Sequence, residues 1–100
     1  MSIELEAFNP YEYKTITATT TSANVAFSTN VGKNLRMFNS GTSVGYLTWG
    51  NGASQTATST TGYPLGPGVT EIVKTGGIDN VAGIVLTGSA NIYVVRGDGI

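Results

Sequence analysis

The chain has 100 residues, 40% hydrophobic and only 11% charged, with a formal net charge of −1 at pH 7. A chain of this length forms at most one domain with a thin core, and its few scattered charges argue against a nucleic-acid partner. It contains no cysteine and no histidine, which excludes disulfides, thiol nucleophiles, imidazole bases and the commonest zinc ligands.

The first predicted element is an extended N-terminal arm, residues 1–12, which has no sustained apolar period and contains the Asn9-Pro10 break. Its first residues are acidic, whereas a signal peptide is first basic and then apolar. No apolar stretch in the chain approaches the ~20 residues that span a bilayer. The sequence therefore predicts no membrane partner and a cytoplasm-like setting during synthesis.

Apolar side chains alternate with acidic and polar ones along this arm. Such alternation is consistent with a strand that joins the edge of a partner's sheet, where main-chain hydrogen bonds supply affinity. We expect the arm to cross onto a neighbouring copy or a larger protein surface, and the alternative is a frayed terminus. The predicted protein-interface residues are Ile3, Leu5, Phe8, Tyr11 and Tyr13.

From residue 13 onward, short β-type runs alternate with turn signals, which is typical of a sandwich or barrel. Threonine suits pleated strands, and glycine and asparagine suit tight turns, so long helices are not expected. We predict one all-β domain over residues 13–100, an antiparallel β-sandwich of about eight short strands. The predicted strands are residues 13–19, 23–27, 35–39, 44–49, 53–62, 69–74, 81–86 and 90–96.

Three of these strands and one connecting segment carry more specific expectations. Residues 53–62 are nearly all small and polar, so they form either a weak edge strand or a loop. Residues 63–68 contain two prolines and two glycines, which predicts a shaped corner rather than a central strand. Residues 81–86 are almost continuously apolar and are expected to be central. In residues 90–96 both alternating faces are apolar enough that we expect both to be covered.

No catalytic, cofactor-binding or metal-binding residue is predicted. General acid–base catalysis needs titratable groups that converge in a cleft, and the six acidic residues are mostly isolated in the arm or in turns. Glu71 lies within a predicted strand, where we expect it to face solvent. The segments Asp79-Asn80 and Gly97-Asp98-Gly99 lack the spaced acids of a calcium loop. We therefore expect a protein that is not an enzyme and has no cofactor.

Short motifs follow one another in a recognisable order along the chain. They are Ser22-Ala23-Asn24-Val25, Leu35-Arg36-Met37-Phe38-Asn39-Ser40-Gly41, Leu47-Thr48-Trp49-Gly50-Asn51-Gly52, Thr60-Thr61-Gly62-Tyr63-Pro64-Leu65, Pro67-Gly68-Val69-Thr70-Glu71, Val81-Ala82-Gly83-Ile84, Ala90-Asn91-Ile92-Tyr93-Val94 and Gly97-Asp98-Gly99. From about residue 23 to residue 100, this order resembles that of the small β-sandwich virion proteins of tailed bacteriophages, which serve as head decoration or cement proteins.

The resemblance implies a jelly-roll-like sandwich on the outer surface of a phage head, where it stabilises contacts between major capsid subunits. The implied partners are the major capsid protein and further copies of the chain, as a homodimer or homotrimer. The implied location is the capsid exterior, after assembly in the host cytoplasm.

Two other functions stay open. The first is a receptor- or carbohydrate-binding module of a tail or fibre, for which the aromatic residues Tyr46, Trp49, Tyr63 and Tyr93 are candidates. The same rings are also expected in or beside the core, because large aromatic side chains dominate small cores. The second is a structural component of the tail or connector.

Overall fold

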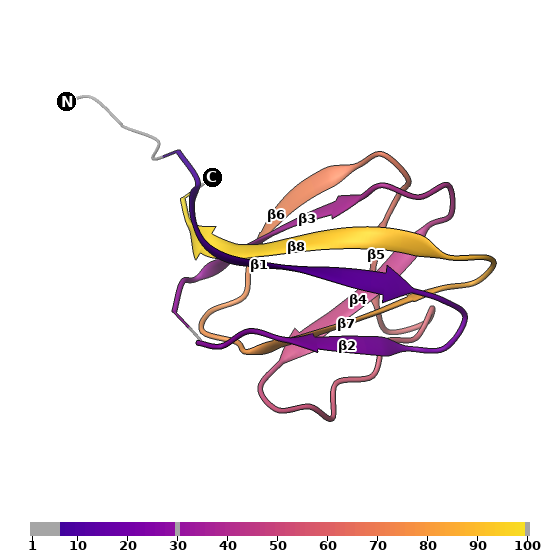
Figure 1. Ribbon diagram of the computed structural model, residues 1–100, viewed down its shortest axis with the longest axis horizontal. Helices are drawn as coiled ribbons and strands as arrows, with labels where there is room; N and C mark the ends of the chain where they lie inside the picture. The colour runs from indigo at the N-terminus through magenta and orange to yellow at the C-terminus, as the bar shows by residue number, and fades with distance from the viewer. Residues whose placement is uncertain (1–6, 30, 100) are drawn as a thin grey trace.

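The computed structural model describes residues 7–29 and 31–99. Within them all regular elements are β-strands, and no helix long and apolar enough to cross a bilayer occurs in this part of the chain. The strands are β1 (Asn9–Ala18), β2 (Ala23–Ala26), β3 (Asn34–Asn39), β4 (Gly45–Gly50), β5 (Tyr63–Leu65), β6 (Thr70–Lys74), β7 (Asn80–Val85) and β8 (Ala90–Asp98) (Figure 1).

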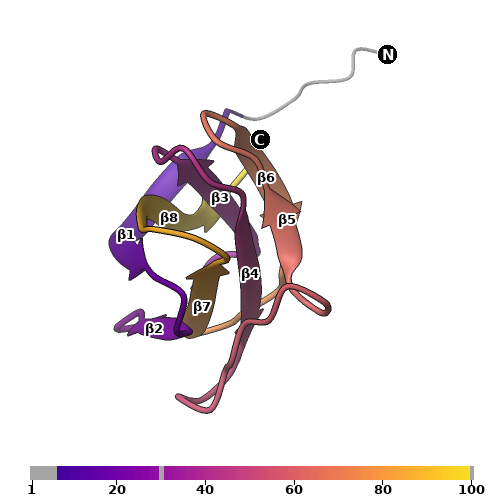
Figure 2. The ribbon, with the colours of Figure 1, turned by 90° about the vertical axis from the view of Figure 1, so that its right-hand side faces the viewer.

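The eight strands form two four-stranded antiparallel sheets, with the orders β1-β8-β3-β6 and β2-β7-β4-β5. Among consecutive strands, only β4 and β5 are neighbours in one sheet, and every other pair lies in different sheets. The chain therefore passes back and forth between two packed layers (Figure 2). The predicted all-β antiparallel sandwich is confirmed.

The core lies between the sheets and is built from alternate residues. In β8, Ile92 and Val94 are 0% exposed and face the other sheet, whereas Asn91 and Tyr93 point outward. The apolar strand β7 lies between β2 and β4 and is central, as predicted. The expectation that both faces of residues 90–96 are covered is wrong, because Tyr93 is 41% exposed.

The fifth strand is β5 and not residues 53–62. It pairs only with β4, at the edge of its sheet, and Pro64 lies opposite Tyr46. A proline is tolerated there because an edge strand needs ladder hydrogen bonds on one side only. The predicted corner follows directly, where Val69 N–H donates to Gly66 O at 3.1 Å and Gly68 adopts a φ of 74°.

Residues 53–62 form a loop that is tied to β2. The Nδ2 group of Asn24 donates to Gln55 O at 3.2 Å, and the Ala57 N–H donates to Ser22 Oγ at 2.9 Å. Because these bonds run from side chains to main chain, they hold the loop without forming a ladder.

Strand β1 begins earlier than predicted. Asn9 pairs with Asp98 and Glu12 pairs with Arg96, with a bulge between Pro10 and Glu12. The prediction that the whole arm leaves its own sandwich is therefore wrong for residues 9–12, because β8 extends far enough to pair with them. Residues 1–6, which include the predicted interface residues Ile3 and Leu5, lie outside the described residues.

A buried arginine holds one end of the sandwich together. Arg96 of β8 is 1% exposed. Its Nη1 donates to Thr75 Oγ1 at 2.8 Å, and its Nη2 donates to Gly76 O at 3.1 Å and to Gly32 O. Burial lowers the pKa of Arg96, and the nearby Asp98 carboxylate opposes that effect. Main-chain carbonyls thus replace water around the guanidinium and tie two turns to β8.

Candidate protein-binding face

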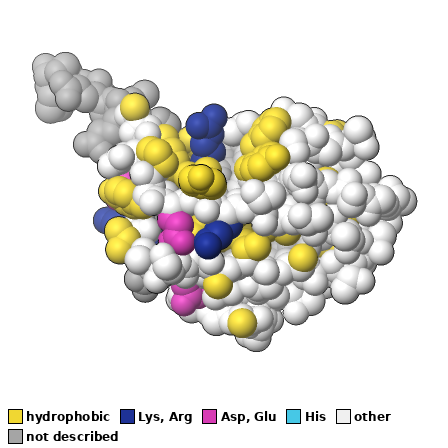
Figure 3. All heavy atoms as spheres, viewed as in Figure 1, with side chains coloured by type: hydrophobic (Ala, Val, Ile, Leu, Met, Phe, Trp, Pro, Cys, Tyr) yellow, Lys and Arg dark blue, Asp and Glu magenta, His cyan; other side chains and the backbone are white. Residues whose placement is uncertain are grey.

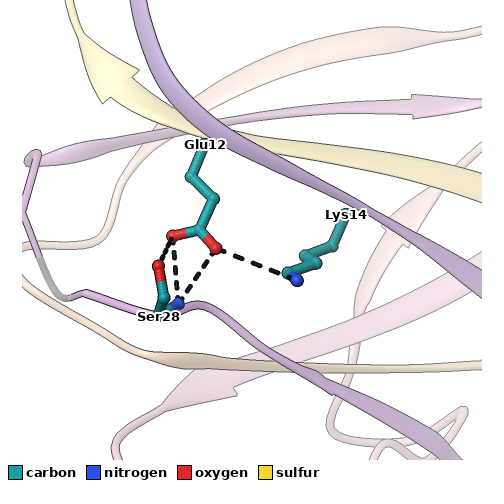
Figure 4. Close-up of polar contacts among 3 residues, drawn as sticks. All are labelled: Glu12, Lys14 and Ser28. Carbon is teal, nitrogen blue, oxygen red and sulfur yellow. Dashed lines mark hydrogen bonds and ion pairs between the residues drawn. The ribbon is translucent and has the colours of Figure 1, made fainter.

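A glutamate bridges each long side of the sandwich. Glu12 of β1 accepts hydrogen bonds from the N–H and Oγ of Ser28, both at 3.0 Å, and lies 3.9 Å from Lys14 Nζ (Figure 4). The bond from the Ser28 N–H is the main reason that the pKa of Glu12 is lowered. On the opposite side, Glu71 of β6 accepts from the Tyr63 hydroxyl of β5, which raises the pKa of Tyr63. The prediction that Glu71 faces open solvent is therefore wrong, because its side chain lies against the edge of the neighbouring sheet.

The two described aspartates are also bound within the chain. Asp79 accepts from Asn80 Nδ2 at 2.7 Å and from Gly52 N–H at 2.9 Å, and Asp98 accepts from the Tyr11 hydroxyl at 2.8 Å. The bond from Asn80 is the main cause of the lowered pKa of Asp79, and the bond from Tyr11 is the main cause for Asp98. No cluster of acidic side chains that could hold a metal occurs in residues 7–29 and 31–99. The described acids thus serve the fold.

The structure separates the predicted interface residues. Phe8 is half-buried against the end of β8, where a Cβ on Gly97 would lie 2.7 Å from its Cζ. Tyr11 is 47% exposed and its hydroxyl is engaged by Asp98. Tyr13 is 76% exposed and points outward from the sheet. Phe8 and Tyr11 therefore pack along their own chain, and Tyr13 contributes to a larger exposed surface.

That surface is the solvent side of the sheet β1-β8-β3-β6, which we call the outer face. The antiparallel register sets its side chains in rows across the four strands, because residues paired across strands share a face. Figure 3 shows the molecule from the side of Figure 1, where hydrophobic, basic and acidic side chains are all exposed. The outer face is defined by the row Tyr13, Val95, Arg36 and Ile72, the row Thr15, Tyr93, Phe38 and Thr70, and the adjacent Lys74.

The outer face is hollowed into a shallow groove of about 370 Å³. The groove is lined by Arg36, Phe38, Thr70, Tyr93 and Val95. The rings of Phe38 and Tyr93 stack, with their centroids 6.3 Å apart and 16° between their planes. Exposed apolar surface of this kind, next to polar groups, is typical of protein-interaction sites.

Among the described residues that define it, the outer face carries basic side chains and no acidic one. Arg36 lies opposite Ile72, and Lys74 lies opposite Asn34. This makes Arg36 and Lys74 diagonal neighbours on one face, with a Cα separation of ~7–8 Å. Within residues 7–29 and 31–99, Lys14 and Glu12 form the only ion pair, so neither Arg36 nor Lys74 is paired with a described carboxylate. The face is therefore positive although the net charge of the chain is −1.

A second groove, of about 450 Å³, lies along β4 and β5 and includes Trp49 and Tyr63 in its lining. The two rings are tilted by 50°, with centroids 5.8 Å apart. Both side chains are half-buried and pack against the core. The Tyr63 hydroxyl already donates to Glu71. The main role of the Trp49 and Tyr63 rings is therefore to pack against the core.

The predicted interface residues do not include Arg36 and Phe38. The structure places these two side chains on the outer side of β3, and it places Leu35 and Met37, each 0% exposed, on the inner side. Which side stays uncovered depends on strand pairing, and no local pattern carried that information.

No protein-family model, no curated protein and no solved structure matches this chain. Its function is therefore argued from its own residues.

Proposed function

We propose that this chain is a structural virion protein, a decoration or cement protein that binds the outer surface of a phage head. The observation that carries the proposal is the outer face, an uncovered apolar and basic surface on a domain whose described acids all hold the fold. Protein interfaces are enriched in aromatic residues and arginine, which supply most of the binding energy. The order of motifs along the chain supports the location on a head.

We also propose that the sandwich is a jelly roll. A jelly roll has eight strands, arranged as two Greek keys in two sheets. The orders β1-β8-β3-β6 and β2-β7-β4-β5 support this topology, because every connection except β4–β5 joins the two sheets. Jelly rolls are common in viral capsid and lectin domains, so this fold suits both the virion role and a carbohydrate-binding role.

The proposed partners are the major capsid protein, whose subunit contacts the bound chain would stabilise, and further copies of the chain in a homodimer or homotrimer. An oligomer is favoured because a domain of 100 residues without a disulfide has a thin core, which association would extend. The part that residues 1–6 take in binding stays a prediction. The proposal involves no catalysis and no cofactor.

Immunogold labelling of phage particles from the strain that carries the gene tests this role. We expect antibodies against the full-length chain to label the outside of the heads. Label confined to the tails would favour a tail or connector component, and particles without label would contradict a virion role. Light scattering after size-exclusion chromatography tests the oligomer, and a monomer at tens of micromolar would contradict it.

The second candidate is a receptor- or carbohydrate-binding module, and the groove beside Trp49 and Tyr63 favours it. A glycan array probed with the isolated protein distinguishes the two functions. Specific binding that is abolished by Trp49→Ala, with the fold retained, would favour the carbohydrate role.

A further inference from the structure

We infer that the groove on the outer face docks acidic side chains of a protein partner, with Arg36 as the carboxylate-binding residue. This inference rests on the proposed role as a binding protein. It adds the chemistry of the contact, which is a carboxylate beside an apolar or aromatic side chain.

The positive charge of the outer face favours the binding of an anion. Arg36 is exposed at one edge of the groove, and Lys74 is its diagonal neighbour. Like charges so close on a sheet face repel each other, and neither is paired with a described carboxylate. A carboxylate from a partner relieves this repulsion. The planar guanidinium of arginine matches a carboxylate with two parallel hydrogen bonds.

The remainder of the groove is suited to an apolar side chain next to that carboxylate. Val95 lies directly opposite Arg36, and the stacked rings of Phe38 and Tyr93 lie in the next row. An aromatic or aliphatic side chain that covers these groups removes apolar surface from water, which is the main source of interface affinity. The Thr70 hydroxyl at the groove wall can donate to a partner oxygen.

The same charges favour a protein over a nucleic acid. The described outer face carries two cations, Arg36 and Lys74, whereas proteins that follow a phosphate backbone neutralise many phosphates with clustered lysine and arginine. Two cations next to stacked aromatic rings match a short acidic and apolar protein segment.

The test is a titration of the ¹⁵N-labelled full-length chain, followed by NMR, with a random copolymer of glutamate and tyrosine as the probe. Poly-glutamate and oligo(dT) serve as comparisons. We expect the amide signals of Arg36, Phe38, Tyr93 and Val95 to shift, and the shifts to weaken as salt is added. The glutamate–tyrosine copolymer should bind more tightly than poly-glutamate, because only it covers the rings.

Arg36→Gln should weaken binding by about tenfold or more, since it removes a charge-assisted contact. Arg36→Lys should bind more tightly than Arg36→Gln but less tightly than the parent, because lysine keeps the positive charge and cannot make two parallel hydrogen bonds to a carboxylate. Lys14→Gln is the matched control. It removes the same charge from the Glu12 pair at the side of the sandwich, and we expect unchanged affinity.

Three results overturn the inference: no shift of outer-face amides with the copolymer, equal losses in Arg36→Gln and Lys14→Gln, or tighter binding to oligo(dT). Failure of the virion role is a separate result. Binding to heads that survives Arg36→Gln would keep that role and overturn the carboxylate site. If the copolymer binds through Arg36 but antibodies against the chain label no phage particle, the carboxylate site would stand and the virion role would be overturned.

Discussion

Replacement of Arg96 by methionine tests whether the buried guanidinium holds the end of the sandwich. Methionine keeps an unbranched apolar stem and has no donor, so the carbonyls of Gly32 and Gly76 lose their partner. Each buried acceptor left without a donor costs ~1–3 kcal/mol. Release of the guanidinium from its own desolvation offsets part of that loss. We therefore expect Arg96→Met to lower the free energy of unfolding by about 2–4 kcal/mol.

In a domain of this size, each kcal/mol shifts the melting temperature by ~4–8 °C. Thermal unfolding followed by circular dichroism should therefore show a loss of roughly 10–30 °C for Arg96→Met. Arg36→Met makes the same chemical change at an exposed position of β3 and should stay within about 0.5 kcal/mol of the parent. A loss below about 1 kcal/mol in Arg96→Met, or equal losses in both variants, would refute the structural role of Arg96.

Three further predictions concern acid, backbone and alkaline behaviour. The folded-state pKa of Glu12 lies below its ordinary value of 4.5, so the stability it contributes is present above that pH and is lost as the pH falls through the folded-state value. With no histidine in the chain, we expect a nearly flat melting temperature from about pH 5 to pH 8 and a fall below about pH 4. The substitution Glu12→Gln should make that fall shallower, and an equally steep fall in the variant would contradict this prediction. Gly97→Ala places a Cβ 2.3 Å from Asn9 O, so we expect the start of β1 to detach and become sensitive to limited proteolysis. In the control variant Gly66→Ala, the new Cβ lies 3.4 Å from its nearest neighbour, and we expect this variant to stay resistant. Tyr63→Phe removes the hydrogen bond to Glu71 and should lower the melting temperature at neutral pH. Because the pKa of Tyr63 is raised above 10.0, the parent protein should lose this stability only as the pH rises beyond that value. Equal melting temperatures in parent and variant would refute a stabilising role for this hydrogen bond.

Much of the fold could be predicted because strand formation here follows local patterns. The apolar run of residues 81–86 predicts a central strand, and β7 does lie between β2 and β4. The errors arose where distant segments decide the outcome. Residues 9–12 join a strand only because β8, at the other end of the chain, pairs with them.

The same limit applies to the candidate site. The outer face is assembled from four strands that come from the beginning, middle and end of the chain. Local spacing puts Arg36 and Phe38 on one side of β3, but only the pairing with β8 brings them against Val95 and Tyr93. Phe8 and Tyr11 were chosen for their aromatic rings, and their engagement by Gly97 and Asp98 could not be read from neighbouring residues.

The most direct test of the central claim is a cryo-electron microscopy map of a phage head that carries the protein. We predict that the outer face meets the shell, with Tyr13, Arg36 and Tyr93 at the contact, and that the loop of residues 53–62 points to solvent. A map in which the chain meets the shell through that loop or through the Trp49 groove, with the outer face in solvent, would contradict the account.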